Sequence, residues 1–323
     1  MIYTNLYEDV LIKPCQEGAD TLKIISGYAS PTMALCHLDD LSEKHLDAHI
    51  SLFVGMCSSN GLSSSDHIGF KSIVTSDVAS FKNRFSCSYI YKTPSVHSKL
   101  YVWYKDKELY KAFIGSANYT QNAFRYQREL LAEIKDDHIL EYYQALEADS
   151  IFCELPEVEN LIRIHNDRNY YRRQIYENEK SDIAMKNSNI KHIKVSLLSS
   201  KTGEIPNRGG LNWGQRPGRE QNQAYIQLPP DVYNSDFFPK APQWFTIVTD
   251  DDKSFFCRRA EKDVQGQTIH TPQNNSYLGE YFRGRLGLAN GAFITRQDLE
   301  HYGRTDVVFY KIDDENYYMD FSV

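Results

Sequence analysis

The segment VHSKLYVW, residues 96–103, is the part of the sequence that most sharply limits the fold, because it places His97 and Lys99 one residue apart on a predicted β-strand. Side chains two positions apart on a strand point to the same face. An imidazole and an ammonium in this arrangement can both reach one small anion. The pattern alone is weak, since a second His-x-Lys triplet runs from His192 to Lys194. The surrounding sequence therefore has to separate a catalytic pair from two polar residues on an exposed strand.

The residues downstream of His97 distinguish it from the second triplet. After two further predicted strands comes GSANYT, residues 115–120, whose small residues let the backbone turn tightly and approach an anion. Within it, Ser116 is small and Asn118 offers an amide, and Glu129 follows eleven residues after Asn118. No comparable segment follows His192, so we assign that triplet to an exposed strand of a second domain.

The chain changes character near residue 185. Before it, predicted strands alternate with predicted helices, which indicates an α/β domain. After it, short β runs separated by Gly, Pro, Asn and Asp clusters predict an all-β sandwich or barrel, with one short helix at 278–287. The Ser- and Gly-rich segment 57–67 is expected to be a loop. We predict a first domain over residues 1–180, a polar linker over 181–191 and a second domain over 192–323.

Composition excludes several classes of protein. No apolar run is long enough for a membrane span, and the N-terminus does not resemble a secretory signal. Six cysteines without a CxxC pair argue against a zinc knuckle and fit a reducing cytoplasm, which is the expected location. The net charge of −7 argues against general nucleic-acid binding, but residues 201–219 and 281–296 each carry a local charge of +3.

One ordered set of side chains resembles the motif of the phospholipase D superfamily, HxK followed by GSxN. The set comprises His97, Lys99, Ser116, Asn118 and Glu129. Members that hydrolyse phospholipids usually carry an Asp soon after the Lys, whereas here the fifth residue after Lys99 is Tyr104. The nuclease branch lacks that Asp and uses a later Glu, which Glu129 matches, with Glu133 as the competing candidate. The resemblance implies a mixed sheet flanked by helices.

These side chains suit phosphodiester hydrolysis. A neutral His97 imidazole can attack phosphorus and form a phosphohistidine. Lys99 and the Asn118 amide can stabilise charge on the non-bridging oxygens. Glu129 is expected to orient His97 by accepting from its other ring nitrogen. The sequence contains no Asp/Glu cluster suited to a metal, so we expect a metal-independent reaction without a cofactor.

The reaction also needs a second histidine as general acid. In the phospholipase D superfamily this histidine comes from a second copy of the motif. The chain has one copy, so we expect a homodimer formed through the first domain, with His97 of each subunit on either side of a two-fold axis.

Two loops of the second part carry side chains that pair with base edges. Arg and Asn or Gln form bidentate contacts with guanine and adenine. The first loop lies within 207–223 and the second within 271–287. The candidate DNA-contacting residues are Arg208, Asn212, Trp213, Gln215, Arg216, Arg219, Asn222, Gln223, Gln273, Asn274, Asn275, Arg283 and Arg285. An ordinary turn is the alternative for each loop, because Asn and Gly favour turns.

The second part also resembles a known DNA-binding domain. Segments such as LNWGQRPGREQNQAYIQLP and NNSYLGEYFRGRLGL are similar to the C-terminal domain of the NgoFVII-type restriction endonucleases. That domain is similar to the B-three fold of plant transcription factors, a seven-stranded open pseudobarrel that grips the major groove with two arms. The resemblance implies a first arm at 207–223 and a second within 250–285. We expect Trp213 to pack as a structural anchor.

The sequence as a whole therefore predicts a type II-like restriction endonuclease that cleaves double-stranded DNA at or near a short specific site. Some relatives work with a helicase-like ATPase subunit, and any ATP dependence would come from such a partner because the chain has no GxxxxGK[ST] motif. The alternatives are a non-specific or damage-directed nuclease, a lipid phosphodiesterase, and a DNA-binding regulator with a decayed nuclease half.

Overall fold

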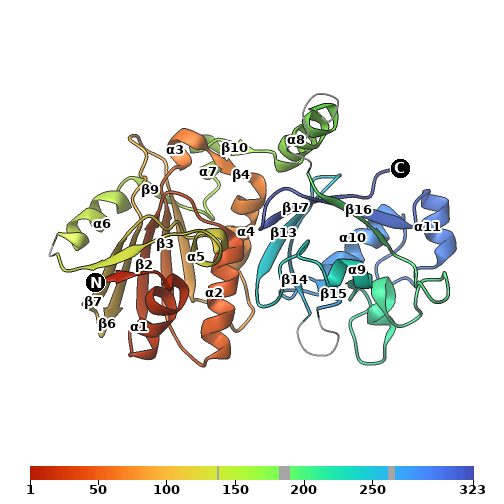
Figure 1. The fold of residues 1–323 in the computed structure, drawn as a ribbon, viewed down its shortest axis with the longest axis horizontal. Coiled ribbons are helices and arrows are strands. Elements are labelled where there is room, and N and C mark those ends of the chain that lie inside the picture. Colours follow the sequence, from red (N-terminus) through yellow and green to blue (C-terminus); the bar gives the residue numbers. More distant parts are fainter. Residues whose placement is uncertain (137, 182–189, 261–265) are drawn as a thin grey trace. The chain divides into compact units, whose positions relative to one another are not determined.

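The structure is a computed structural model that describes residues 1–136, 138–181, 190–260 and 266–323. The chain forms two compact units, Met1–Asn166 and Asp167–Val323 (Figure 1). The units divide before helix α8 (Asp167–Ser181), whereas the boundary expected from the sequence follows that helix. Residues 182–189 of the expected linker lie outside the described residues, so the linker stays a prediction.

The first unit is built on an eight-stranded mixed sheet, in the order β1-β8-β7-β6-β2-β3-β5-β9. Its strands are β1 (Ile2–Tyr3), β2 (Thr21–Ser26), β3 (His49–Val54), β5 (Phe85–Ile90), β6 (Leu100–Lys105), β7 (Glu108–Gly115), β8 (Leu131–Ile134) and β9 (Ser150–Phe152). Strands β2, β3 and β5 are parallel neighbours, and every other pair is antiparallel. This confirms the expected α/β domain with a mixed sheet.

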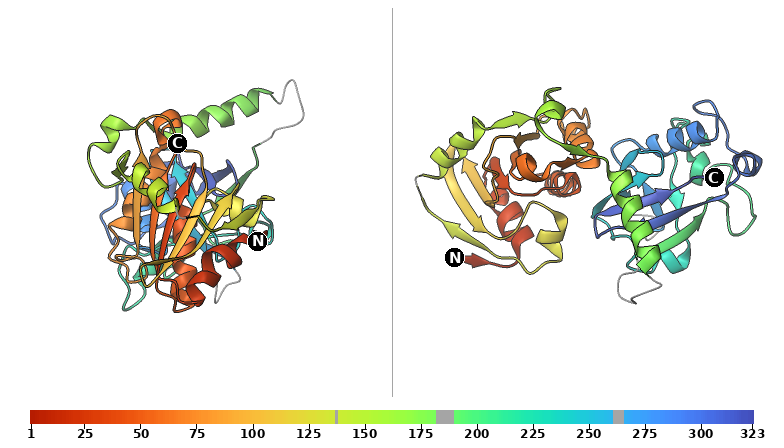
Figure 2. Two further views of the ribbon diagram at one scale, coloured as in Figure 1. Left: turned by 90° about the vertical axis from the view of Figure 1, so that its left-hand side faces the viewer. Right: turned by 90° about the horizontal axis from the view of Figure 1, so that it is seen from above.

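Helices cover both faces of this sheet because its central strands are apolar on both sides. Ile25 and Phe53 are register partners on β2 and β3, and they pack against α6 (Ile139–Glu147) through residues such as Tyr143. Figures 1 and 2 show α2 (Pro31–Glu43) and α4 (Ser64–Val74) on the opposite face. The short helices are η1 (Tyr7–Ile12), α1 (Lys13–Gln16), α3 (Cys57–Asn60), α5 (Gln121–Arg125) and α7 (Val158–Leu161).

The prediction of a loop at residues 57–67 is wrong. Instead, α3, the short strand β4 (Leu62–Ser63) and the start of α4 occupy it, and β4 pairs with β10 (Ile164–His165). The Ser63 side chain accepts a hydrogen bond of 3.0 Å from the Asp66 backbone N–H and caps α4. Serine in this segment is therefore a helix start signal as well as a loop residue.

The strand directions bring the motif residues to one edge of the sheet. Strands β2 and β7 end at this edge, while β6 and β8, which run antiparallel to their neighbours, begin there. Residues 26–28, 97–99, 115–118 and 129 lie at these strand ends or within a few positions of them. Segments that are far apart in sequence therefore meet at one edge.

The second unit is an all-β domain with a seven-stranded sheet in the order β11-β16-β17-β13-β14-β15-β12. The sheet curls into a nearly closed barrel around an apolar core that includes Phe238, Phe245 and Phe309. This confirms the expected B-three-like fold. Its strands are β11 (His192–Ser196), β12 (Ile226–Gln227), β13 (Trp244–Thr249), β14 (Ser254–Arg259), β15 (Thr268–His270), β16 (Asp306–Lys311) and β17 (Asn316–Asp320).

Helices of the second unit lie around the barrel. Helix α10 (Tyr277–Arg285) matches the helix expected at 278–287. The 3-10 helix η2 (Gly210–Gln215), α9 (Pro230–Tyr233) and α11 (Arg296–Tyr302) complete the set of described helices. Helix α8 packs on β13 and β17, with Tyr171 and Ile175 against Val248 and Tyr318.

Candidate active site

His97 and Lys99 lie against each other, but they are not on the predicted strand: β6 begins at Leu100, and both residues belong to the segment that leads into it. His97 is exposed, whereas Lys99 is only 7% exposed. The Lys99 ammonium donates to the His97 carbonyl oxygen at 2.7 Å and lies 3.2 Å from each ring nitrogen of His97. An ammonium can only donate, so Lys99 can donate to whichever ring nitrogen of His97 carries no proton.

The environment of Lys99 perturbs its pKa. Burial lowers the pKa of the Lys99 ammonium from its usual range, and the negative charge of Glu129 opposes this shift. Removing water from an ammonium disfavours its charged form, and a nearby carboxylate favours it. Lys99 is thus a buried cation beside His97, and the charge of Glu129 acts on it.

Asn118 has a fixed orientation. Its Oδ1 accepts a hydrogen bond of 3.2 Å from the Tyr28 backbone N–H and lies 3.5 Å from the Ser26 hydroxyl oxygen. A backbone N–H can only donate, so the amide oxygen must face Tyr28. The Asn118 Nδ2 then lies at the other end of the amide, where it can donate to a ligand oxygen.

Glu129 is held by Ser116. The Ser116 hydroxyl donates to Glu129 Oε2 and accepts from the Leu130 backbone N–H at 3.2 Å. Across the described ranges, no hydrogen bond joins Glu129 to His97, so the orienting contact expected from the sequence is not formed in this structure. Glu129 instead contributes its charge at Lys99 and fixes Ser116.

The competing carboxylate, Glu133, lies on β8 itself, whereas Glu129 precedes that strand. It accepts a hydrogen bond of 2.9 Å from the Tyr3 hydroxyl and pairs in register with Phe113 on β7. Its charge acts on Tyr3 and Lys111 rather than on Lys99. Of the two carboxylates that the sequence left open, Glu129 is the one placed beside the motif residues.

The turn after β2 contributes residues that the sequence did not single out. The fully buried Ser26 hydroxyl donates to the Tyr28 carbonyl at 2.5 Å and accepts from the Tyr119 backbone N–H at 2.9 Å. A Cβ at Gly27 would lie 3.1 Å from His97 Cδ2. The Tyr28 ring meets the His97 ring edge to face, with centroids 6.0 Å apart. The turn therefore forms a wall of the site, and only its position after a buried strand could have suggested it.

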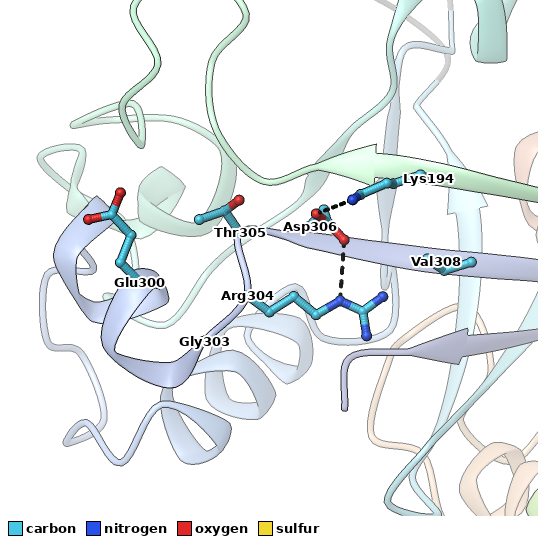
Figure 3. A pocket seen from close by; sticks show the side chains of 7 residues that line it. All are labelled: Lys194, Glu300, Gly303, Arg304, Thr305, Asp306 and Val308. Atoms are coloured by element: carbon cyan, nitrogen blue, oxygen red, sulfur yellow. Dashed lines mark hydrogen bonds and ion pairs between the residues drawn. The ribbon is translucent and has the colours of Figure 1, made fainter. Parts of the chain in front are cut away.

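The second His-x-Lys triplet lies on an exposed strand of the second unit, β11, as expected. Lys194 on β11 forms an ion pair of 2.9 Å with Asp306 on β16, and Asp306 also pairs with Arg304 at 3.2 Å (Figure 3). His192 packs its ring on Tyr310 with centroids 5.5 Å apart. The cavity beside this network, of about 530 Å³, is lined by charges that already have partners.

Several residues predicted to contact DNA lie inside the second unit. Asn212 is fully buried, donates to the Ile294 carbonyl at 2.8 Å and accepts from the Ile294 N–H at 2.9 Å. Asn222 is buried and accepts from the Gly291 N–H at 2.7 Å, and the half-buried Gln215 donates to the Gly291 carbonyl at 3.0 Å. These side chains fix the loop rather than face solvent, so we no longer assign Asn212 and Asn222 to base contacts.

The arginines of residues 281–296, which give that segment its local charge of +3, are buried or paired within the domain. Arg283 is fully buried and donates to the carbonyl oxygens of Gly279, Leu211 and Ala292. Arg285 pairs with both carboxylate oxygens of Asp250 at 2.9 Å. Arg296 pairs with Glu300 at 2.6 Å. Burial and pairing remove Arg283 and Arg285 from the candidate DNA surface.

The first arm keeps exposed positive charge. Arg208, Arg216 and Arg219 are exposed, and the Arg216 Nε donates to the Arg208 carbonyl at 2.7 Å. The Arg219 guanidinium lies 3.9 Å above the Trp213 ring and donates to Gln223 Oε1 at 2.8 Å. Trp213 in turn meets Tyr225 edge to face, which agrees with an anchoring role.

The three amide residues at 273–275 lie before α10. Gln273 and Asn275 are half-buried, and Asn274 is exposed. Asn274 Oδ1 accepts from the Ser276 N–H at 3.0 Å, whereas Asn275 Oδ1 is buried without a hydrogen-bond partner among the described residues. Residues 261–265, within the expected second arm, lie outside the described residues.

The described ranges contain neither a cluster of metal ligands nor a membrane-spanning helix. No group of three or more His, Cys, Asp or Glu side chains there could hold a metal ion. Every helix in these ranges is too short or too polar to cross a bilayer. All six cysteines are free thiols.

Comparison with known proteins identifies both units. Residues 4–160 match the family model for the NgoFVII restriction endonuclease N-terminal PLD domain, where PLD denotes phospholipase D, and residues 185–313 match the model for the NgoFVII C-terminal B3-like DNA-binding domain. No curated protein matches. NucT from Helicobacter pylori is similar at 17% identity and a TM-score of 0.33, over 47% of this chain and 97% of that chain. Polyphosphate kinase from Porphyromonas gingivalis is similar at 18% identity and a TM-score of 0.29, over 45% of this chain and 20% of that chain. The two family models carry the assignment.

Proposed function

Because the chain belongs to the NgoFVII restriction endonuclease family and is a phospholipase D-like DNA nuclease, we propose that it cleaves double-stranded DNA at or near a short specific sequence. One observation carries this proposal. The exposed His97 imidazole lies against the buried Lys99 ammonium, beside an Asn118 amide whose nitrogen is turned away from the protein donors. A nucleophile, a cation and a hydrogen-bond donor are the parts that phosphodiester cleavage requires.

The proposed reaction has two steps. A His97 ring nitrogen attacks phosphorus, forming a P–N bond while the bond from phosphorus to the leaving sugar oxygen breaks. A second histidine gives its proton to that oxygen. Water then attacks the phosphohistidine, loses a proton to the second histidine and releases the phosphorylated DNA end. No metal ion takes part in either step.

Each neighbour of His97 has a role in this scheme. Lys99 and Asn118 Nδ2 bind the non-bridging oxygens and stabilise the negative charge that develops there. Glu129 keeps Lys99 protonated against the effect of burial. Ser116 holds Glu129 in place. The second histidine is His97 of a second copy of the chain, so the active protein is a homodimer joined through the first unit.

The second unit supplies sequence recognition in this proposal. Exposed Arg208, Arg216 and Arg219 give the first arm a positive surface suited to the DNA backbone and to guanine edges. Gln223, Gln273 and Asn274 add amide groups for adenine edges. A helicase-like ATPase partner stays a prediction.

A plasmid cleavage assay tests the nuclease proposal. Wild type is expected to give discrete fragments in the presence of EDTA, and His97→Ala is expected to lose at least 10³-fold in rate, as enzymes do when the nucleophile is removed. His192→Ala, from the second His-x-Lys triplet on the exposed strand β11, is the matched control and should cleave like wild type. Activity in His97→Ala, or its loss on adding EDTA, would overturn the mechanism. A smear without discrete fragments would overturn sequence specificity.

A further inference from the structure

Tyr28 is the one exposed aromatic side chain of the described chain that packs directly on the His97 ring. It is 41% exposed, and its ring meets the imidazole at an interplanar angle of 82°. The exposed part of this ring is not packed against the protein core. A bound ligand could cover the ring and remove its apolar surface from water.

The backbone of Tyr28 is tied to the motif. Its N–H donates to Asn118 Oδ1 at 3.2 Å, and its carbonyl accepts from the Ser26 hydroxyl at 2.5 Å. Gly27 lets the turn approach His97, because a Cβ there would lie 3.1 Å from the ring. Tyr28 therefore keeps a set position relative to both His97 and Asn118.

The hydroxyl of Tyr28 is prepared to donate. Asn60 Nδ2, from α3, donates to the Tyr28 hydroxyl oxygen at 2.6 Å. The Ser59 hydroxyl donates to Asn60 Oδ1 at 3.2 Å, which orients the amide so that its nitrogen faces Tyr28. A phenol oxygen that accepts from an amide keeps its own proton for another partner. The phenol proton is thus directed away from Asn60.

We propose that Tyr28 is a substrate-contacting residue that binds the DNA strand one nucleotide from the scissile phosphate. Its ring packs on a deoxyribose and its hydroxyl donates to the flanking phosphate oxygen. Tyr side chains are among the usual donors to phosphate and sugar in protein–DNA complexes. Double-stranded DNA presents sugar and phosphate rather than base faces at its outer surface, which favours this contact over base stacking. The inference rests on the proposed role of His97.

Single-turnover cleavage at varied enzyme concentration tests this inference, with the half-saturating concentration and the maximal rate as separate readouts. Tyr28→Phe should raise the half-saturating concentration about tenfold by loss of a hydrogen bond to a charged group, with the maximal rate within about threefold of wild type. Tyr28→Ala should raise it further, since it also loses the ring. Asn60→Ala should show a smaller effect, and Tyr28→Phe combined with Asn60→Ala should match Tyr28→Phe alone.

Tyr110→Phe is the matched control. Tyr110 is half-buried, and its hydroxyl donates to Glu17 at 2.8 Å. It lies near the start of β7, whereas the site is at the other end of this strand. A Tyr28→Phe variant that behaves like Tyr110→Phe would overturn the contact. A fall in maximal rate with unchanged half-saturation would also overturn it, because it would show that Tyr28 acts only through Asn118. Activity in His97→Ala would instead reject the proposed mechanism, which keeps the two failures distinguishable.

Discussion

Replacing Ser26 by alanine removes the hydroxyl that joins the turn after β2 to the GSANYT segment, residues 115–120. The hydroxyl makes two short hydrogen bonds, to the Tyr28 carbonyl at 2.5 Å and from the Tyr119 N–H at 2.9 Å, inside a fully buried environment. Each such bond contributes about 1 kcal/mol net. We therefore expect Ser26→Ala to lower the free energy of unfolding by about 2 kcal/mol, as two such bonds are lost.

The same substitution should slow cleavage. Without Ser26, the Tyr28 N–H that holds Asn118 Oδ1 is no longer fixed, so the Asn118 amide loses its set direction. A displacement of about 1 Å in a catalytic group can cost about 10²-fold in rate. We expect the single-turnover rate of folded Ser26→Ala to fall by at least about tenfold, but by less than about 10²-fold.

Urea unfolding and single-turnover cleavage measure the two effects separately. Ser51→Ala is the control, because the Ser51 hydroxyl hydrogen-bonds the Tyr143 hydroxyl at 3.0 Å on β3, apart from the motif residues. It should lose stability without losing rate. If Ser26→Ala is destabilised but cleaves at the wild-type rate, the coupling of Ser26 to Asn118 is refuted.

Three further substitutions have defined outcomes. Glu129→Gln removes the negative charge that raises the pKa of Lys99, so this pKa should fall further. The alkaline limb of the cleavage pH profile should then move to lower pH. A limb that does not move would reject the role of Glu129. Arg219→Ala should weaken binding of the cognate duplex about tenfold in an anisotropy titration, whereas Arg296→Ala, which loses a residue already paired with Glu300, should bind like wild type. Asn212→Ala should lower the free energy of unfolding by about 2 kcal/mol through loss of two buried hydrogen bonds, and a stability equal to that of wild type would contradict its internal role.

The sequence predicted the fold well where periodicity and strand length are strong. The apolar runs of β2 and β3 and the alternating short strands of the second unit gave the correct domain classes. The helices in segment 57–67 were missed, because serine favours both loops and helix N-caps. Only the hydrogen bond from the Asp66 N–H to the Ser63 side chain shows that Ser63 caps a helix.

The motif residues could be found because their order in the chain identifies them. Their neighbours could not, since Ser26 and Tyr28 meet Asn118 only through the antiparallel pairing of β2 with β6 and of β6 with β7, the strand that Asn118 follows. Composition was misleading in the second unit, where Arg283 is fully buried rather than exposed to DNA. The charge of a segment can be counted from its sequence, but whether each charged side chain faces solvent or the core cannot.

The covalent intermediate is the most direct test of the central claim. Wild-type protein mixed with end-labelled cleavable DNA is denatured during the first turnover at alkaline pH, which preserves a phosphohistidine, and the labelled peptide is mapped by mass spectrometry. We expect a phosphoryl–DNA adduct on the His97 side chain that decays as cleaved product appears. Cleavage that proceeds with no adduct on His97, or with an adduct on another residue, would contradict the account.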